Sequence, residues 1–106
     1  MSYSNNEIKK KLQDWCDNEK SGVIILSVGD SGEWKNNPVG RMGFIINATF
    51  DKGEYLPLDY ANYVDKGFYQ KFMDAADSND KVSQKKIVQV IKRELVIGIH
   101  PRTKLI

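Results

Sequence analysis

The first twenty residues carry one apolar stripe at helical spacing, with polar side chains on the opposite face. The stripe consists of Ile8, Leu12, Trp15 and Cys16. Ahead of it, Ser4-Asn-Asn-Glu7 fits a capping box, in which each of the two outer side chains accepts a hydrogen bond from the other residue's backbone N–H. The pattern predicts a helix over residues 5–19 that ends at Ser21-Gly22.

Two apolar runs after this helix predict strands. Residues 22–28 are rich in β-branched side chains and apolar on both faces, which predicts a central position in a sheet. Residues 42–50 predict a second strand, and the turn signal in residues 51–54 follows it. Tyr55-Leu56 then predicts a short third strand, which the following proline keeps from pairing centrally.

The second half of the chain is predominantly helical in pattern. Residues 58–80 have loosely helical spacing that Gly67 interrupts, which predicts one or two short helices. Ser78-Asn-Asp80 is an N-cap cluster for a helix that runs to about Glu94. The competing assignment makes residues 87–91 a strand, but the strong helix formers around them favour the helix.

The last apolar run predicts a closing strand over residues 95–99, with His100-Pro101 ending it. The predicted fold class is therefore α+β. We expect a small antiparallel or mixed sheet of three to four strands, with an N-terminal helix and one to two further helices packed on it. The length of 106 residues predicts a single domain over residues 1–106.

Charge is distributed unevenly along a chain whose net charge is only +2. Residues 1–80 hold 9 Lys/Arg and 13 Asp/Glu, whereas residues 81–106 hold 7 Lys/Arg and one acid, Glu94. An acidic body can attract a basic partner, and a basic end can attract nucleic acid. Equally, both can be ordinary solvated faces. With one cysteine and no apolar run of membrane-spanning length, we expect a cytoplasmic protein.

Candidate catalytic residues do not form a constellation. His100 is the only histidine, so a catalytic triad or metal site built on it lacks evident partners. Cys16 lies beside Trp15 on the apolar stripe, which is typical of a small buried hydrophobe. Asp74, Asp77 and Asp80 lack the glycine and glutamate of a calcium loop, and we interpret them as helix-capping acids. We therefore expect no enzymatic activity, no cofactor and no metal.

Contact chemistry is concentrated instead in two segments. Residues 29–43 hold four glycines, one proline and a single large aromatic, Trp34, flanked by Asp30 and Glu33. Tryptophan is enriched at interface hot spots, although it can also fold back to cover the edge of the core. Residues 51–80 carry seven Asp/Glu against three Lys, with tyrosines interleaved. This combination can meet a basic surface, and a pair of half-buried helices is the alternative.

A resemblance covers the first of these segments. Gly22-Val-Ile-Ile-Leu-Ser-Val-Gly-Asp-Ser-Gly-Glu-Trp-Lys-Asn-Asn-Pro-Val-Gly40 resembles the strand, Gly-containing loop, Trp and Asn-Pro of the immunity protein of the anticodon-cleaving E-group colicin. The chain is also similar in element order to small bacterial immunity proteins, including those of contact-dependent growth inhibition systems. The resemblance implies a non-catalytic protein that neutralises one cognate toxin, often a nuclease, as a heterodimer in the cytoplasm.

A nuclease must present positive charge to bind phosphates, so an inhibitor can compete by placing carboxylates and aromatics there. The residues that we expect to bind the toxin are Asp30, Glu33, Trp34, Asp51, Glu54, Tyr55, Asp59 and Tyr63. The expectation for Trp34 depends on the motif, and the expectation for the later acids depends on local charge alone.

The second hypothesis is a small RNA- or DNA-binding module that uses the basic C-terminal helix and tail. Its residues would be Lys81, Lys85, Lys86, Lys92, Arg93, Arg102 and Lys104. A solvated basic helix face is the commoner case, so direct nucleic-acid binding is not the function that we expect from the sequence. No membrane partner is expected.

Overall fold

The computed structural model describes residues 3–30, 44–50, 60–65 and 67–105, and in this part of the chain one helix, three strands and two further helices follow one another as an α+β fold. The elements are α1 (Asn5–Asn18), β1 (Val23–Asp30), β2 (Phe44–Phe50), β3 (Tyr60–Asp65), α3 (Phe68–Asp77) and α4 (Lys81–Leu105). For Asp30, Phe44, residues 60–65 and residues 97–105 the structure describes the backbone alone. The predicted α+β class and N-terminal helix are confirmed.

Helix α1 begins as the capping signal predicted. The Ser4 backbone N–H donates to Glu7 Oε1 at 2.7 Å, and the Glu7 N–H donates to Ser4 Oγ at 3.1 Å. These bonds lower the pKa of the Glu7 carboxyl, because the Ser4 backbone N–H stabilises its charged form. The helix ends before Lys20, which has a positive φ of 50°. All four residues of the predicted stripe are buried.

The strands form an antiparallel sheet in the order β1-β2-β3. β2 is the middle strand of the three, so the central position predicted for β1 is wrong within the described residues. A bulge between Ile25 and Ser27 leaves the intervening Leu26 45% exposed. Among the described residues, the edge of β1 that faces away from β2 contacts α1 and pairs with no fourth strand. The predicted strand at Tyr55-Leu56 lies outside the described residues.

β3 corrects the helical interpretation of residues 60–65. Tyr60, Tyr63 and Val64 have a spacing of three and four that also fits a helix, but these residues pair with Thr49, Ile46 and Ile45 of β2. Tyrosine and valine have high β-propensity, and pairing with a formed strand decides such an ambiguous segment. Of the one or two helices predicted over residues 58–80, the structure contains α3, which begins directly after Gly67.

The prediction for the end of the chain is wrong, because helix α4 occupies it. The predicted closing strand over residues 95–99 lies within this helix, which also passes through Pro101 to Leu105. Leu95 is only 2% exposed and follows Ile91 by four positions, so it continues the buried row that Val88 and Ile91 begin. The row offers core contacts that only a helix can align, and it overrides the β-propensity of the apolar residues that follow.

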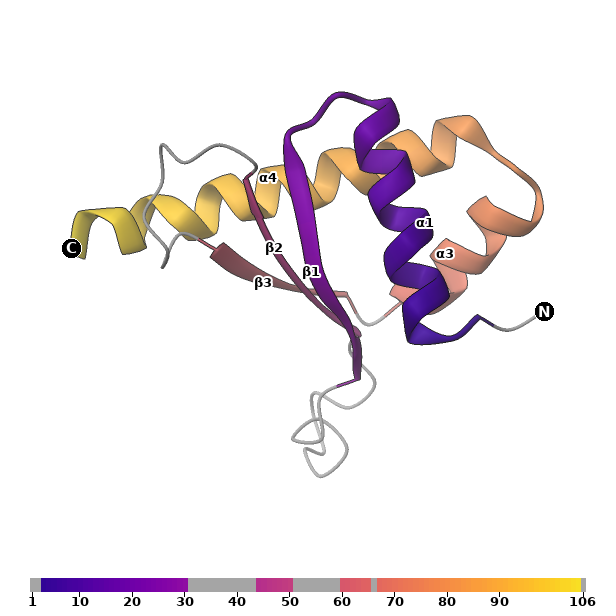
Figure 1. The fold of residues 1–106 in the computed structure, drawn as a ribbon, viewed down its shortest axis with the longest axis horizontal. Coiled ribbons are helices and arrows are strands. Elements are labelled where there is room, and N and C mark those ends of the chain that lie inside the picture. Colours follow the sequence, from indigo (N-terminus) through magenta and orange to yellow (C-terminus); the bar gives the residue numbers. More distant parts are fainter. Residues whose placement is uncertain (1–2, 31–43, 51–59, 66, 106) are drawn as a thin grey trace.

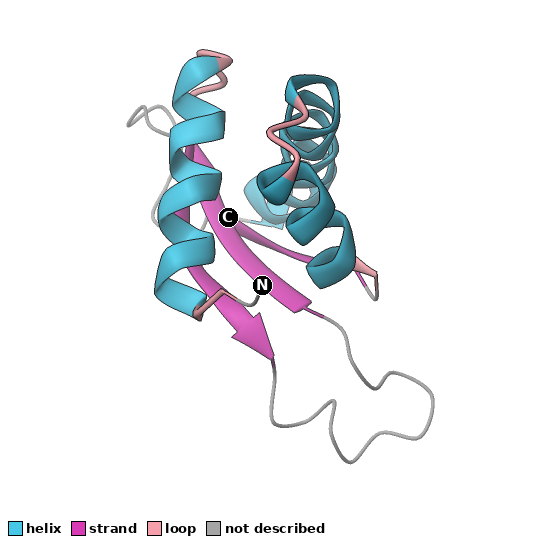
Figure 2. Cartoon of the chain, turned by 90° about the vertical axis from the view of Figure 1, so that its right-hand side faces the viewer, coloured by secondary structure: helices cyan, strands magenta, loops and turns pink. Residues whose placement is uncertain are grey.

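One core joins the helices to one face of the sheet. Its members are Ile8, Leu12, Trp15, Cys16, Val23, Ile25, Ile46, Ala48, Phe68, Phe72, Ala75, Val88, Ile91 and Leu95. α4 crosses the strands along its length, and α1 lies beside β1 (Figure 1). Figure 2 shows α1 on one side of the view and α3 with α4 on the other, with strands between them. Across this core, the Trp15 and Phe72 ring centroids lie 5.1 Å apart.

Within the described ranges, no helix combines the length and apolar character needed to cross a membrane.

Candidate functional site

Most of the predicted toxin-binding residues lie outside the described part of the chain. These are Glu33, Trp34, Asp51, Glu54, Tyr55 and Asp59. Asp30 and Tyr63 lie in strands whose backbone is described, at the end of β1 and in the second half of β3. The strand register therefore shows where the two predicted segments leave and enter the sheet.

Asp30 marks one end of the sheet. It pairs with Phe44 of β2, and Phe44 pairs in turn with Asp65 of β3. Two acidic positions thus flank Phe44 in one row across the three strands, with the segment 31–43 connecting Asp30 to Phe44. Two strand spacings separate the backbones of Asp30 and Asp65 by about 10 Å. Asp65 was not among the predicted site residues, because its approach to Asp30 depends on strand pairing.

The register brings Tyr63 into the same half of the sheet. Tyr63 pairs with Ile46, which also pairs with Val28 of β1. The Tyr63 backbone lies two strands away from that of Asp30 and two residues further along the strand direction, which corresponds to a separation of about 12 Å. Asp30, Asp65 and Tyr63 therefore belong to one end of the sheet.

The later predicted acids belong to the opposite end. Residues 51–59 connect Phe50 to Tyr60, and these two residues end β2 and begin β3. The seven residues of β2 separate this end from Phe44 by about 20 Å. The structure therefore does not join the two predicted groups at one end, and a single partner could touch both only by lying along the strands.

Gln13, which no sequence pattern singles out, covers part of the outer edge of β1. Gln13 Nε2 donates to the Val23 carbonyl at 2.9 Å, and the Ile25 N–H donates to Gln13 Oε1 at 2.8 Å. One side-chain amide thus offers the donor and the acceptor that a neighbouring strand would offer. This pairing occupies one end of β1 and leaves it unsuited to bind an extended peptide there.

Of the three acids interpreted as helix-capping, only Asp80 caps a helix in the described structure, since the Asp74 carboxylate accepts the Gln70 amide instead. Asp80 accepts hydrogen bonds from the backbone N–H groups of Val82 and Ser83, at 3.1 and 3.2 Å. The Ser83 hydroxyl also donates to Asp80, and together these bonds lower the pKa of the carboxyl. Asp77 accepts the Tyr3 hydroxyl, and this bond raises the pKa of that phenol.

Cys16 has the environment of a structural residue. Its side chain is 0% exposed, and burial raises the pKa of its thiol to about 11. The thiolate is the nucleophilic form, so at neutral pH this thiol is protonated and inaccessible.

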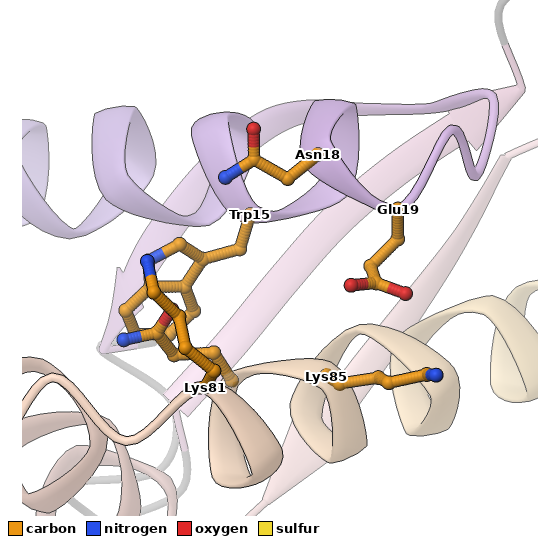
Figure 3. A pocket seen from close by; sticks show the side chains of 6 residues that line it. Trp15, Asn18, Glu19, Lys81 and Lys85 are labelled. Carbon is orange, nitrogen blue, oxygen red and sulfur yellow. The ribbon is translucent and has the colours of Figure 1, made fainter.

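A small hollow of about 60 Å³ lies where the end of α1 meets the start of α4, and we call it the α1–α4 hollow. Its lining residues are Trp15, Asn18, Glu19, Lys81, Gln84 and Lys85. Figure 3 shows the side chains of Trp15 and Glu19 extending from α1 toward α4, whereas the Asn18 side chain lies along α1. The hollow therefore joins two cations, one carboxylate and an indole.

Two buried side chains of this hollow keep an unused hydrogen-bonding atom. Trp15 is 8% exposed, and among the described residues its indole N–H has no hydrogen-bond partner. Gln84 is 6% exposed and donates to the Ala75 carbonyl at 3.0 Å, while its side-chain oxygen accepts no hydrogen bond within the same part of the chain. Buried polar atoms are nearly always paired, so these two atoms suit a bound polar group.

A second, more open hollow of about 230 Å³ lies between α3 and α4, lined by Lys71, Asp74, Ser83, Lys86 and Ile87. Across the described side chains, His, Cys, Asp and Glu do not gather into a group of three that could hold a metal ion.

Comparison with family models, with curated proteins and with solved structures found no match to this chain.

Proposed function

We propose that this chain is an immunity protein that binds a cognate bacterial toxin and neutralises it. The toxin would be a nuclease acting on RNA, such as a tRNA-cleaving domain, and the inhibitor would cover its cationic substrate-binding surface. The chain would act in the cytoplasm as one partner of a heterodimer, without catalytic activity or a cofactor.

The observation that supports this proposal is the row Asp30–Phe44–Asp65 at one end of the sheet. The segment that carries the resemblance to colicin immunity proteins leaves β1 at Asp30, so Glu33 and Trp34 follow this row directly in the chain. Two acidic positions whose backbones lie about 10 Å apart, followed in the sequence by an acid and an indole, would offer a nuclease both charge and stacking area in place of RNA.

The same register divides the predicted contacts into a primary and a secondary group. The primary group is Asp30 and Tyr63, in the half of the sheet that Asp65 also occupies, together with Glu33 and Trp34, which follow Asp30 within four positions in the sequence. The secondary group is Asp51, Glu54, Tyr55 and Asp59, which would reach the toxin only if its surface extends about 20 Å along the strands.

Growth rescue tests the proposal. The toxin domain encoded beside this chain is expressed with the wild-type chain, which should restore growth, and the two proteins should copurify as a heterodimer. Asp30→Lys combined with Glu33→Lys should abolish rescue, because both changes place cations against a cationic surface. Trp34→Ala should weaken binding by about 2 kcal/mol or more if the indole is an interface anchor.

Matched variants separate the two groups of contacts. Asp51→Lys combined with Glu54→Lys makes the same charge change at the opposite end of the sheet and should leave most of the rescue intact. Asp14→Lys, at an exposed position of α1, should have no effect. Failure of the wild-type chain to rescue growth would refute the function, and equal loss from both double variants would refute the assignment of the primary end.

A further inference from the structure

The exposed side of α4 carries five cations, and this surface is named the cationic face. Its members are Lys81, Lys85, Lys86, Lys92 and Arg93. Within the described part of the chain, none of the four lysines forms an ion pair, and Arg93 meets only Glu94, at 3.9 Å. The other exposed residues of α4 up to residue 96 are Val82, Gln89 and Val96, and the one carboxylate next to this face in that range is Glu94, beside Arg93.

The helix arranges these cations in two parallel rows. Lys81, Lys85 and Lys92 follow one another at four and seven positions, and Lys86 and Arg93 form a second row seven positions apart. At a rise of 1.5 Å per residue the first row is about 16 Å long, the distance over which one strand of a duplex presents about five phosphates.

The α1–α4 hollow lies at the beginning of the first row. Lys81 and Lys85 line it together with Trp15, whose buried indole N–H lacks a partner in the described structure. An indole N–H can only donate, so the group that completes it must be an acceptor. Lys81 extends toward the indole, whereas the Lys85 side chain points along α4 away from it (Figure 3). One ammonium group beside one unused donor makes an anionic oxygen, such as that of a phosphate, the chemically matched acceptor. Two acceptors of the hollow oppose such a group, the Glu19 carboxylate and the unused side-chain oxygen of Gln84.

We propose that the cationic face of α4 binds the phosphate backbone of a nucleic acid, with one phosphate at the α1–α4 hollow. This interaction is distinct from toxin binding and does not depend on it. Lysines act as point charges, so the face would read phosphate without selecting a sequence. An acidic protein is the less suitable partner, because the two exposed apolar residues of the face, Val82 and Val96, stand about 20 Å apart and form no central anchor.

Fluorescence anisotropy with the purified full chain alone tests the proposal. The probes are a labelled single-stranded RNA and a labelled DNA duplex, each titrated between about 50 mM and about 200 mM salt. Five phosphate contacts predict a slope of log K against log salt of about −4.5 on the duplex and about −3.5 on the single strand. The corresponding loss of duplex affinity across this range is about 500-fold.

Variants locate the contact. Lys85→Gln combined with Lys92→Gln removes two contacts from the first row and should make the duplex slope shallower by about 2. Lys9→Gln combined with Lys10→Gln makes the same charge change at exposed positions of α1 and should leave the slope unchanged. Trp15→Phe keeps an aromatic ring in the core but removes the N–H, and it should weaken binding by about tenfold. Glu19→Gln should tighten binding, since it removes the opposing charge.

Three results would overturn the proposal. They are the absence of binding to either probe at the lowest salt, equal slopes for the α1 and α4 double variants, and competition by polyglutamate as effective as that by unlabelled RNA. The last result would identify a surface for acidic proteins. Thermal melting of each variant checks that the fold is intact. Because the toxin is absent from the assay, the outcome is independent of growth rescue, which the α4 double variant should retain.

Discussion

Removal of the Gln13 side chain measures how much the covered edge of β1 contributes to stability. Gln13→Ala deletes the bond to the Val23 carbonyl at 2.9 Å, the bond from the Ile25 N–H at 2.8 Å and an exposed bond to Asp17 at 3.0 Å, which is of the same kind as the bond of the control below. A net hydrogen bond is worth about 1 kcal/mol, and both backbone groups belong to residues no more than 3% exposed, where water replaces a lost partner poorly. Alanine has a higher helix propensity than glutamine, and this offsets a few tenths of a kcal/mol of the lost stability.

The free energy of unfolding should therefore fall by about 2 kcal/mol, which lowers Tm by about 10 °C for a chain of this size. Urea unfolding followed by circular dichroism measures the change, and an unchanged m value confirms that the native state is equally compact. The matched control is Gln70→Ala on α3. That exposed amide donates only to Asp74, at 2.9 Å and four positions away, so its loss should cost less than about 0.5 kcal/mol.

Gln13→Glu tests the donor separately. The introduced carboxyl still accepts from the Ile25 N–H, but in its charged form it faces the Val23 carbonyl oxygen without a proton to donate. That contact raises its pKa in the folded state, so the variant should be most stable below the unfolded pKa of about 4.3 and lose stability as pH rises through the folded value. Relative to wild type, its stability should therefore recover on acidification.

Gln13→Ala can also be tested by its effect on self-association. An opened strand edge can pair with another chain, so Gln13→Ala should show concentration-dependent association in sedimentation experiments where the wild type does not. If Gln13→Ala costs no more than Gln70→Ala, the amide contributes no stability to the β1 edge. In that case the packing of α1 brings Gln13 into contact with β1, and these contacts do not stabilise the position of α1.

Three further predictions concern α4 and the core. Asp80→Ala should lower Tm by a few degrees at neutral pH through loss of the N-cap. Because the folded-state pKa of Asp80 is lowered, this difference should be present above the unfolded pKa of about 3.8 and vanish as pH falls through the folded value. Leu95→Ala, at a 2% exposed position, should cost about 3 kcal/mol in urea unfolding, whereas Val96→Ala at 39% exposure should cost well under 1 kcal/mol. Burial raises the pKa of the Cys16 thiol from its ordinary value of 9.0 to about 11, so this thiol should react with a thiol reagent at least about 100-fold more slowly in the native state than in urea.

The parts of the fold that the sequence predicts correctly are those with local causes. The capping box, the apolar stripe of α1 and the N-cap at Asp80 each depend on residues within a few positions of one another. The same holds for Cys16, whose place on the stripe implies its burial. Such features are readable from one sequence because no distant contact is needed to form them.

The errors fall where a distant segment decides. Residues 60–65 become β3 because β2 is available to pair with them, and residues 95–99 continue α4 because the core below Ile91 also accepts Leu95. In both segments the local pattern is compatible with helix and strand alike, so propensity could not choose between them. The placement of β1 at the edge has a similar cause, since it is α1 that occupies the position expected for another strand.

The candidate sites show the same division. The aromatic and acidic segments could be named from composition, but their separation to opposite ends of the sheet follows from the antiparallel order β1-β2-β3. Asp65 could be placed beside this site only through its register with Phe44. Gln13 and Gln84 carry no sequence signal at all, because glutamines in a helix are ordinarily solvated, and only their partners in β1 and α3 distinguish them.

Charge separation in three dimensions connects the two proposals. The cationic face occupies α4, whereas the acidic row Asp30–Asp65 lies at the end of the sheet that the segment 31–43 closes. A basic nuclease is repelled by the first surface and attracted by the second, so the chain's own field would orient such a partner toward the acidic end before contact. A nucleic acid is attracted by the cationic face and repelled by the acidic row. If both proposals hold, toxin and nucleic acid should bind without competing, and added salt should weaken each association, because each depends on a surface of a single sign.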